Sequence, residues 1–135
     1  MIPTTQIVDY LMNNYYSYYK GKEDIVPTSE QIEAAVKNHP DKLVIVQQGD
    51  IKGMAFFLTL TDETYQRLDT LDIKKVDILI PLLMENGKNI HFILLAADGI
   101  MTIMLGLKRV IQRTRAKTIS WWEPDFSYLH RYNLN

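Results

Sequence analysis

Apolar and polar positions follow one another along the chain in patterns that predict an ordered series of helices and strands. Residues 5–19 and 28–38 repeat apolar side chains at helical spacing. Residues 42–48 and 51–60 form two strand-like runs around Gly49-Asp50, where glycine supplies the positive φ of a tight turn. The first part of the chain is therefore predicted to form two helices followed by an antiparallel hairpin.

The second half of the chain carries its longest strand signal. Residues 89–97 (NIHFILLAA) are mostly apolar, which is typical of a central strand covered on both faces. An amphipathic helix is predicted over residues 101–115, and a short strand over residues 117–122 (KTISWW) follows it at once. Trp121 and Trp122 must then point to opposite faces of that strand.

The stretch between the hairpin and the central strand leaves one alternative open. A short helix capped by Thr61 or Asp62 is predicted over residues 61–71. Residues 73–85 fit a helix broken at Pro81, which cannot donate an interior hydrogen bond. Asn86-Gly87 could instead close a hairpin there. We favour the broken helix.

Composition and charge exclude several classes of function. The 135 residues predict one domain covering 1–135, with 47% hydrophobic and 23% charged residues. A net charge of −1 gives no overall attraction to nucleic acid or anionic membranes. The chain has no cysteine, which excludes disulfides and thiolate chemistry and fits a cytoplasmic compartment. No apolar run approaches the length of a membrane span, and the N-terminal residues do not form a signal peptide.

The order of these elements resembles the core of GNAT-type N-acyltransferases over residues 5–133. The matching features are two helices, a hairpin with an early glycine (Ile51-Lys52-Gly53-Met54), a central strand, a helix and a further strand. The resemblance implies a single α/β domain, with a mixed sheet, helices on both faces and a short helix over 125–132. It also implies truncation at the C-terminus. Small, motif-poor GNAT-like proteins of tailed phages are similarly short, which suggests a virion component or a protein of the host cytoplasm.

The same resemblance places the acetyl-CoA pyrophosphate at the turn between central strand and helix. Ala97, Gly99, Ile100 and Met101 are then the cofactor-binding positions. The turn reads LLAADGIMTIM, which lacks the polar first residue of the family signature, because Leu94 stands there. Asp98 adds a negative charge where a phosphate would arrive.

An acyltransferase of this type also needs an acid and a base. Tyr128 or Tyr132 lies where the family's thiolate-protonating tyrosine is expected, and Glu123 and Asp125 are the candidate bases. For each of them we favour the simpler interpretation, in which the tyrosines pack a C-terminal helix and the carboxylates are solvated. His91 is expected to be buried in the central strand, and the histidines show no metal-ligand spacing.

Aromatic residues are the candidates for contact surfaces. Four tyrosines cannot share one helix face, so some are exposed; these are Tyr15, Tyr16, Tyr18 and Tyr19. Trp122 is a further interface candidate. The basic run 108–117 is expected to be a solvated helix face rather than a nucleic-acid site.

These patterns favour a GNAT-derived protein that has lost catalysis and acts as a structural or interaction component. A protein partner or a homo-oligomer is expected, and no cofactor. The alternative is an N-acyltransferase in which an amine directly attacks the thioester of acetyl-CoA. The altered cofactor turn favours the first function.

Overall fold

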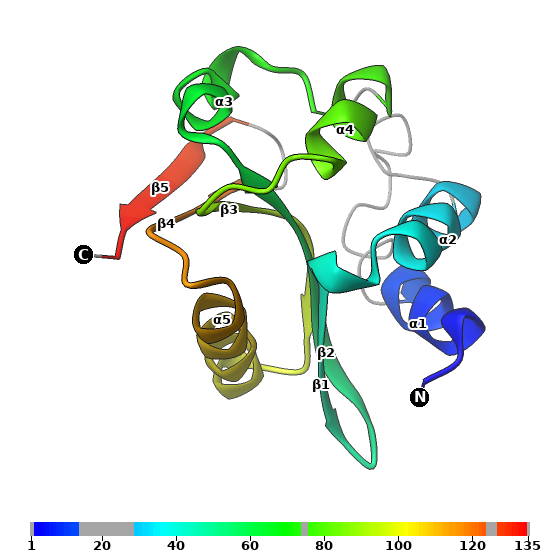
Figure 1. Cartoon of the computed structure of the whole chain (residues 1–135). Helices are drawn as coiled ribbons and strands as arrows, with labels where there is room; N and C mark the ends of the chain where they lie inside the picture. Colours follow the sequence, from blue (N-terminus) through cyan, green and yellow to red (C-terminus); the bar gives the residue numbers. More distant parts are fainter. Residues whose placement is uncertain (1, 14–28, 74–75, 124–126, 135) are drawn as a thin grey trace.

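The computed structural model describes residues 2–13, 29–73, 76–123 and 127–134 (Figure 1). Helices and strands make up most of this part of the chain. In order they are α1 (Thr4–Leu11), α2 (Ser29–Asn38), η3 (Pro40–Lys42), β1 (Leu43–Gln48), β2 (Asp50–Leu60), α3 (Asp62–Gln66), η4 (Leu68–Thr70), α4 (Val76–Leu83), β3 (Asn89–Ala97), α5 (Ile100–Thr114), β4 (Thr118–Trp122) and β5 (Leu129–Asn133).

One mixed sheet organises the molecule, and its strands lie in the order β1-β2-β3-β4-β5. β1, β2 and β3 are antiparallel neighbours, β3 and β4 are parallel, and β4 and β5 are antiparallel. Helix α5 lies on one face of the sheet, and α1, α2 and α4 lie on the other (Figure 1). The predicted α/β architecture with helices on both faces is therefore confirmed.

The hydrophobic core has two parts, one on each face of the sheet. Beneath α1, α2 and α4 the larger part includes Leu11, Ile32 and Phe56. Beneath α5 the smaller part includes Phe57, Phe92 and Val110. Side chains that alternate along β2 and β3 contribute to both parts, which explains why these strands are apolar almost throughout.

Most elements lie where the pattern of apolar residues predicts them. The hairpin turns at Gly49, whose φ is +75°. The stretch 73–85 contains helix α4 with Pro81 inside it, so the broken helix is confirmed over the hairpin. The first helix ends at Leu11. The remainder of its predicted range beyond residue 13, with Tyr15, Tyr16, Tyr18 and Tyr19, lies outside the described residues.

The predicted C-terminal helix is wrong. Residues 129–133 form strand β5, which pairs with β4 from Leu129↔Trp122 to Asn133↔Thr118. The sequence LHRYN places His130 and Tyr132 on one face, and both rings stack on Trp121. These cross-strand contacts and the backbone ladder stabilise an extended conformation, which a helical interpretation of so short a segment overlooks.

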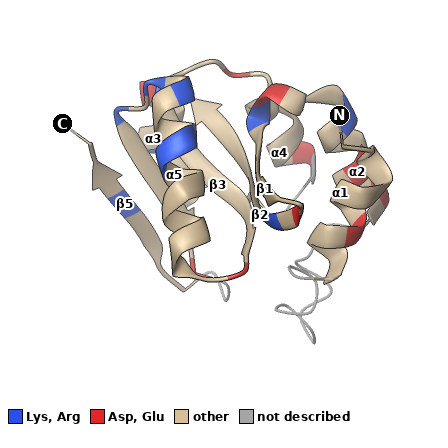
Figure 2. Cartoon of the chain, turned by 90° about the horizontal axis from the view of Figure 1, so that it is seen from below, with Lys and Arg blue, Asp and Glu red and all other residues tan. Residues whose placement is uncertain are grey.

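Two arginines of α5 cover the outer edge of β1. Arg113 Nη2 donates to the carbonyl oxygens of Asp41 at 2.7 Å and Leu43 at 2.9 Å. Arg109 Nη1 donates to the carbonyl oxygen of Ile45 at 3.2 Å. Figure 2 shows the basic residues of α5 along its C-terminal half. These two side chains therefore hold helix to sheet, which the expectation of a solvated basic face did not include.

No helix in the described ranges is both long and apolar enough to cross a membrane.

Candidate functional site

Strand β3 contains one extra residue at the middle of the sheet. Phe56 of β2 pairs with Leu94, and Phe57 pairs with Phe92, so Ile93 has no partner opposite it. A β-bulge of this kind bends its strand and increases the local twist. The bend therefore falls in the middle of β3.

β3 and β4 separate at this bulge. Their parallel pairing runs from Asn89↔Thr118 to Phe92↔Trp121 and ends there. Beyond it, residues 94–97 continue to pair with β2 but have no partner in β4. The second half of β3 thus presents backbone N–H and C=O groups to the opening between the two strands.

The turn after β3 leads directly into the start of α5. Asp98 N–H donates to the carbonyl oxygen of Lys52 at 2.8 Å, which holds the turn against β2. Gly99 occupies the N-cap with φ +125°, and no side chain caps the helix. The first amides of a helix lack acceptors within it, and they carry its positive dipole end. The N–H groups of Ile100, Met101 and Thr102 are therefore oriented toward an incoming anion.

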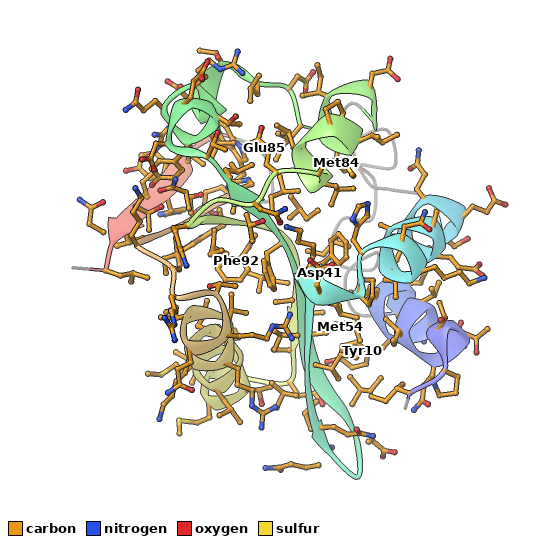
Figure 3. The ribbon with its side chains drawn as sticks, viewed as in Figure 1. Tyr10, Asp41, Met54, Met84, Glu85 and Phe92 are labelled. Carbon is orange, nitrogen blue, oxygen red and sulfur yellow. The ribbon has the colours of Figure 1, made fainter. Side chains whose placement is uncertain are left out.

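The side chain of Asp98, which directly precedes the N-cap, contacts α1. Its Oδ1 accepts a hydrogen bond from the Tyr10 hydroxyl of α1 at 3.4 Å. Burial, and then the negative charge of Asp98, raise the pKa of Tyr10 to about 12. Figure 3 shows Tyr10 and Met54 on the α1 side of the sheet and Phe92 on the α5 side. The sequence suggested that Asp98 would repel a phosphate at this turn. That repulsion is weakened, because the carboxylate is directed toward α1.

Gly53 allows α5 to approach the sheet beside this opening. A Cβ at Gly53 would lie 2.7 Å from Thr102 Cγ2 and 3.1 Å from the carbonyl oxygen of Ala96. A small apolar cavity of about 80 Å³ lies between the helix and the strands, lined by residues that include Ala55, Leu95 and Gly106. The early glycine of the hairpin thus sets the position of the helix start.

Three polar or aromatic side chains meet where β4 ends beside the opening. Glu123 Oε1 lies 2.5 Å from His130 Nε2. The Tyr128 ring stands edge-on to the His130 ring, with 4.7 Å between centroids. Glu123 N–H donates to the carbonyl oxygen of Tyr128 at 2.9 Å, which brings the two residues opposite each other. A carboxylate, an imidazole and a phenol are thereby placed together.

A stack of rings continues from this cluster along β5. The Trp121 ring lies nearly parallel to the His130 ring at 5.1 Å and to the Tyr132 ring at 5.3 Å. Tyr128 and Tyr132 remain exposed. Trp122 points to the opposite face and packs, half-buried, against the larger core. The two tryptophans therefore lie on opposite faces, as predicted, and Trp121 is the one in the ring stack.

The structure brings some of the sequence candidates together and separates others. Glu123 and Tyr128 both contact His130, whereas Tyr132 lies farther along β5 and stacks on Trp121. Ala97 and Gly99 precede α5, and Ile100 and Met101 on its first turn are 71% and 77% exposed. Asp125 lies outside the described residues. Among the described residues, no group of three His, Asp or Glu side chains could hold a metal ion.

The two histidines of the sheet have different surroundings. His91 is fully buried as expected, with Nδ1 2.8 Å from Ser120 Oγ, but its Nε2 has no hydrogen-bond partner in the described structure. Burial, followed by the charge of Arg131, lowers the pKa of His91 to about 3. His130 contacts both Glu123 and Tyr128, a role that the sequence pattern did not predict. The spacing of two residues between His130 and Tyr132, which is typical of one face of a strand, is the sequence signal that could have revealed this role.

Comparison with known proteins gives a structural likeness only. No family model matches the chain, and no curated protein sequence matches it. The structure of GphF, a GNAT-like decarboxylase in complex with isobutyryl-CoA, matches with a TM-score of 0.59 and 12% identity, over 87% of this chain and 60% of that one. The loading GNATL domain of CurA from Lyngbya majuscula matches with a TM-score of 0.49 and 16% identity, over 78% and 57%.

The chain thus spans about 60% of the length of the GphF structure that it matches. At this level of identity the likeness concerns the fold. The order of elements leads to the same fold, and the structure adds a bulged central strand, an opening beside it and a helix that follows. The chain has a GNAT-like fold.

Proposed function

We propose that this protein binds an acyl-CoA and transfers its acyl group to an amine. One observation carries the proposal: the half of β3 that pairs only with β2 runs directly into the uncapped start of α5. Backbone groups that would otherwise complete the sheet and the helix have no partner there in the part of the chain that the structure describes. Backbone N–H and C=O groups are costly to leave without hydrogen bonds. A ligand that carries amides followed by phosphates can bond to the β3 edge with its amides and to the N–H groups of α5 with its phosphates.

The residues present fit an acyl-CoA in two ways. The edge of β3 at residues 94–97 can exchange hydrogen bonds with the amides of the pantetheine arm. The N–H groups of Ile100, Met101 and Thr102 can donate to the pyrophosphate, where backbone donors replace the missing polar side chain. The GphF structure, which holds isobutyryl-CoA, supports this class of ligand through its fold.

The cluster at the end of β4 supplies the proton transfers of the reaction. The amine nitrogen forms a bond to the thioester carbon, and the carbon–sulfur bond breaks. His130, held by Glu123, accepts the proton that the amine loses. Tyr128, whose ring contacts His130, donates a proton to the departing thiolate. Tyr132 is the alternative acid, and its ring stacks on Trp121.

Thiol release from acetyl-CoA in the presence of a panel of amines tests this function. Glu123→Gln and Tyr128→Phe should each lower kcat by about 10²-fold or more, because general acid–base groups contribute at least that much. Glu63→Gln is the matched control, since Glu63 is exposed on α3. Equal rates for all four proteins would assign the thiol release to another group.

A second function is favoured by the surface of α5. Ile100, Met101 and Met104 are 71%, 77% and 60% exposed at the start of this helix. Neighbouring exposed apolar side chains are typical of contact surfaces. A GNAT-like protein without catalysis, acting as an interaction component such as a phage virion protein, would use them in this way. Absence of acyl-CoA binding, together with capture of a partner that Met101→Glu abolishes, would support this function.

A further inference from the structure

The two edges of the sheet differ in their protection. At the β1 edge, three outward carbonyl oxygens accept hydrogen bonds from Arg109 and Arg113. β5 forms the opposite edge, and no described side chain donates to its outer backbone groups. Proteins commonly cover such edges, because an exposed edge pairs readily with another strand.

The backbone groups that face outward from β5 follow from the ladder with β4. Glu123 N–H donates to Tyr128, and Leu134 N–H donates to Lys117, each at 2.9 Å. Even-numbered residues of β5 therefore bond inward, because hydrogen-bonded pairs alternate along an antiparallel ladder. The N–H and C=O groups of Leu129, Arg131 and Asn133 point away from the sheet.

We propose that β5 pairs with β5 of a second copy of this chain, in antiparallel register about a two-fold axis at Arg131. The three outward residues are spaced symmetrically around this position. Leu129 pairs with Asn133 of the second copy, and Arg131 pairs with its own equivalent. Every outward N–H and C=O group between 129 and 133 then has a partner, and the two sheets join into one.

The same register matches the side chains on the α5 face. His130 of each copy lies opposite Tyr132 of the other, at the closely spaced positions of the ladder. Within one chain both rings already stack on Trp121. Pairing therefore extends the stack across the axis and covers Tyr132, which is half exposed in the single chain. Rings are favoured at such contacts because they add large area with few rotatable bonds.

Positive charge at the two-fold axis opposes the pairing of the two copies. Two Arg131 side chains face each other there, and like charges directly opposite are destabilising. The Arg131 guanidinium is drawn away from the axis, because it lies 4.9 Å from the Tyr65 ring centroid and 3.6 Å from Asp69 Oδ1. Asp69 also balances its charge, so the axis can tolerate the pair.

Molar mass in solution tests the pairing, and acyl-CoA plays no part in the readout. Light scattering after gel filtration of the whole chain should give twice 15.7 kDa at high protein concentration. Asn133→Pro removes one outward N–H at an edge position, where proline is tolerated. This variant should shift the equilibrium to the single chain with an unchanged circular dichroism spectrum. A wild-type mass of one chain at every concentration would overturn the proposal.

A cysteine placed at the axis gives a second test, since the chain has none of its own. Cα atoms of a directly opposed pair lie about 5.5 Å apart, within reach of a disulfide. Arg131→Cys should therefore form a linked dimer under mild oxidation. Gln48→Cys is the control at an exposed position on the opposite edge strand, β1, and should remain single. Equal linking of the two variants, or none at position 131, would contradict the register.

Discussion

Phe92 of β3 and Trp121 of β4 form the last rung that joins these two strands. The next residue of β3 is the bulged Ile93, and residues 94–97 pair only with β2. Bulge, separation and helix start follow one another within a few residues. The candidate site is thus a consequence of backbone geometry, and its side chains are mostly apolar.

Gly53 should be a sensitive position for the placement of α5. Gly53→Ala would put a methyl group 2.7 Å from Thr102 Cγ2, so the helix must shift. We expect a loss of about 1–3 kcal/mol in the free energy of unfolding, as for other overpacked sites. Thr102→Ser removes that methyl group, and the double variant should recover part of the loss. Urea denaturation measures all three proteins, and additive losses would contradict the contact.

His91 should make the protein less stable below neutral pH. Its pKa is about 3 when folded and 6.5 as a free side chain. The unfolded chain therefore binds a proton that the folded chain does not, between these two values. Stability should fall as pH drops from 6.5 toward 3 and level off below, with a slope approaching 1.4 kcal/mol per pH unit.

His91→Leu isolates this contribution from the titration of other groups. Between pH 7 and pH 5 the wild type should lose roughly 2 kcal/mol more than His91→Leu, by the same linkage relation. His39→Gln serves as the control, because His39 is not in the buried sheet. Parallel stability profiles for wild type and His91→Leu would show that the imidazole is not buried in the neutral form.

Arg113 should contribute to stability through the edge of β1. Arg113→Gln removes donors to Asp41 and Leu43, and we expect a loss of roughly 1 kcal/mol in the free energy of unfolding. Lys108→Gln is the control, since Lys108 is exposed on the same helix. Both substitutions preserve helix propensity. Equal thermal midpoints for the two variants would argue against a bridging role of the guanidinium.

The elements that bury the most apolar surface could be predicted from the sequence. Residues 89–97 and the glycine turn at 49 carry strong local signals, and both were found where expected. β5 was missed because LHRYN has few strand-forming residues and gains its stability from Trp121 and the β4 ladder. These contacts form only once the chain has folded, so the local sequence of β5 does not predict them.

The candidate site was predictable only in part, for the same reason. Gly99 and Met101 could be placed at a helix start by counting from the strand. The bulge at Ile93 has no local signature, because Ile and its neighbours suit either register. His130 gains its role from its contact with Glu123, and the sequence does not show that these two side chains meet.

The start of α5 should be sensitive to negative charge if it holds a pyrophosphate. Met101→Glu places a carboxylate beside the free N–H groups of the first turn, where the exposed methionine leaves room for it. We expect acyl-CoA affinity to fall at least tenfold, because the new charge repels the phosphates. Met104→Glu, one turn farther on, is the matched control. Equal affinities of the two variants, measured by calorimetry, would place the phosphates elsewhere.

Calorimetric titration of the wild-type protein with acetyl-CoA at modest salt tests the central claim most directly. The opening beside β3 and the uncapped start of α5 predict saturable binding, with one acetyl-CoA per chain and a micromolar dissociation constant. No amine is added, so the titration measures binding without acyl transfer. The absence of heat at millimolar acetyl-CoA, with the protein folded, would contradict acyl-CoA binding and leave the exposed surface of α5 as the functional feature.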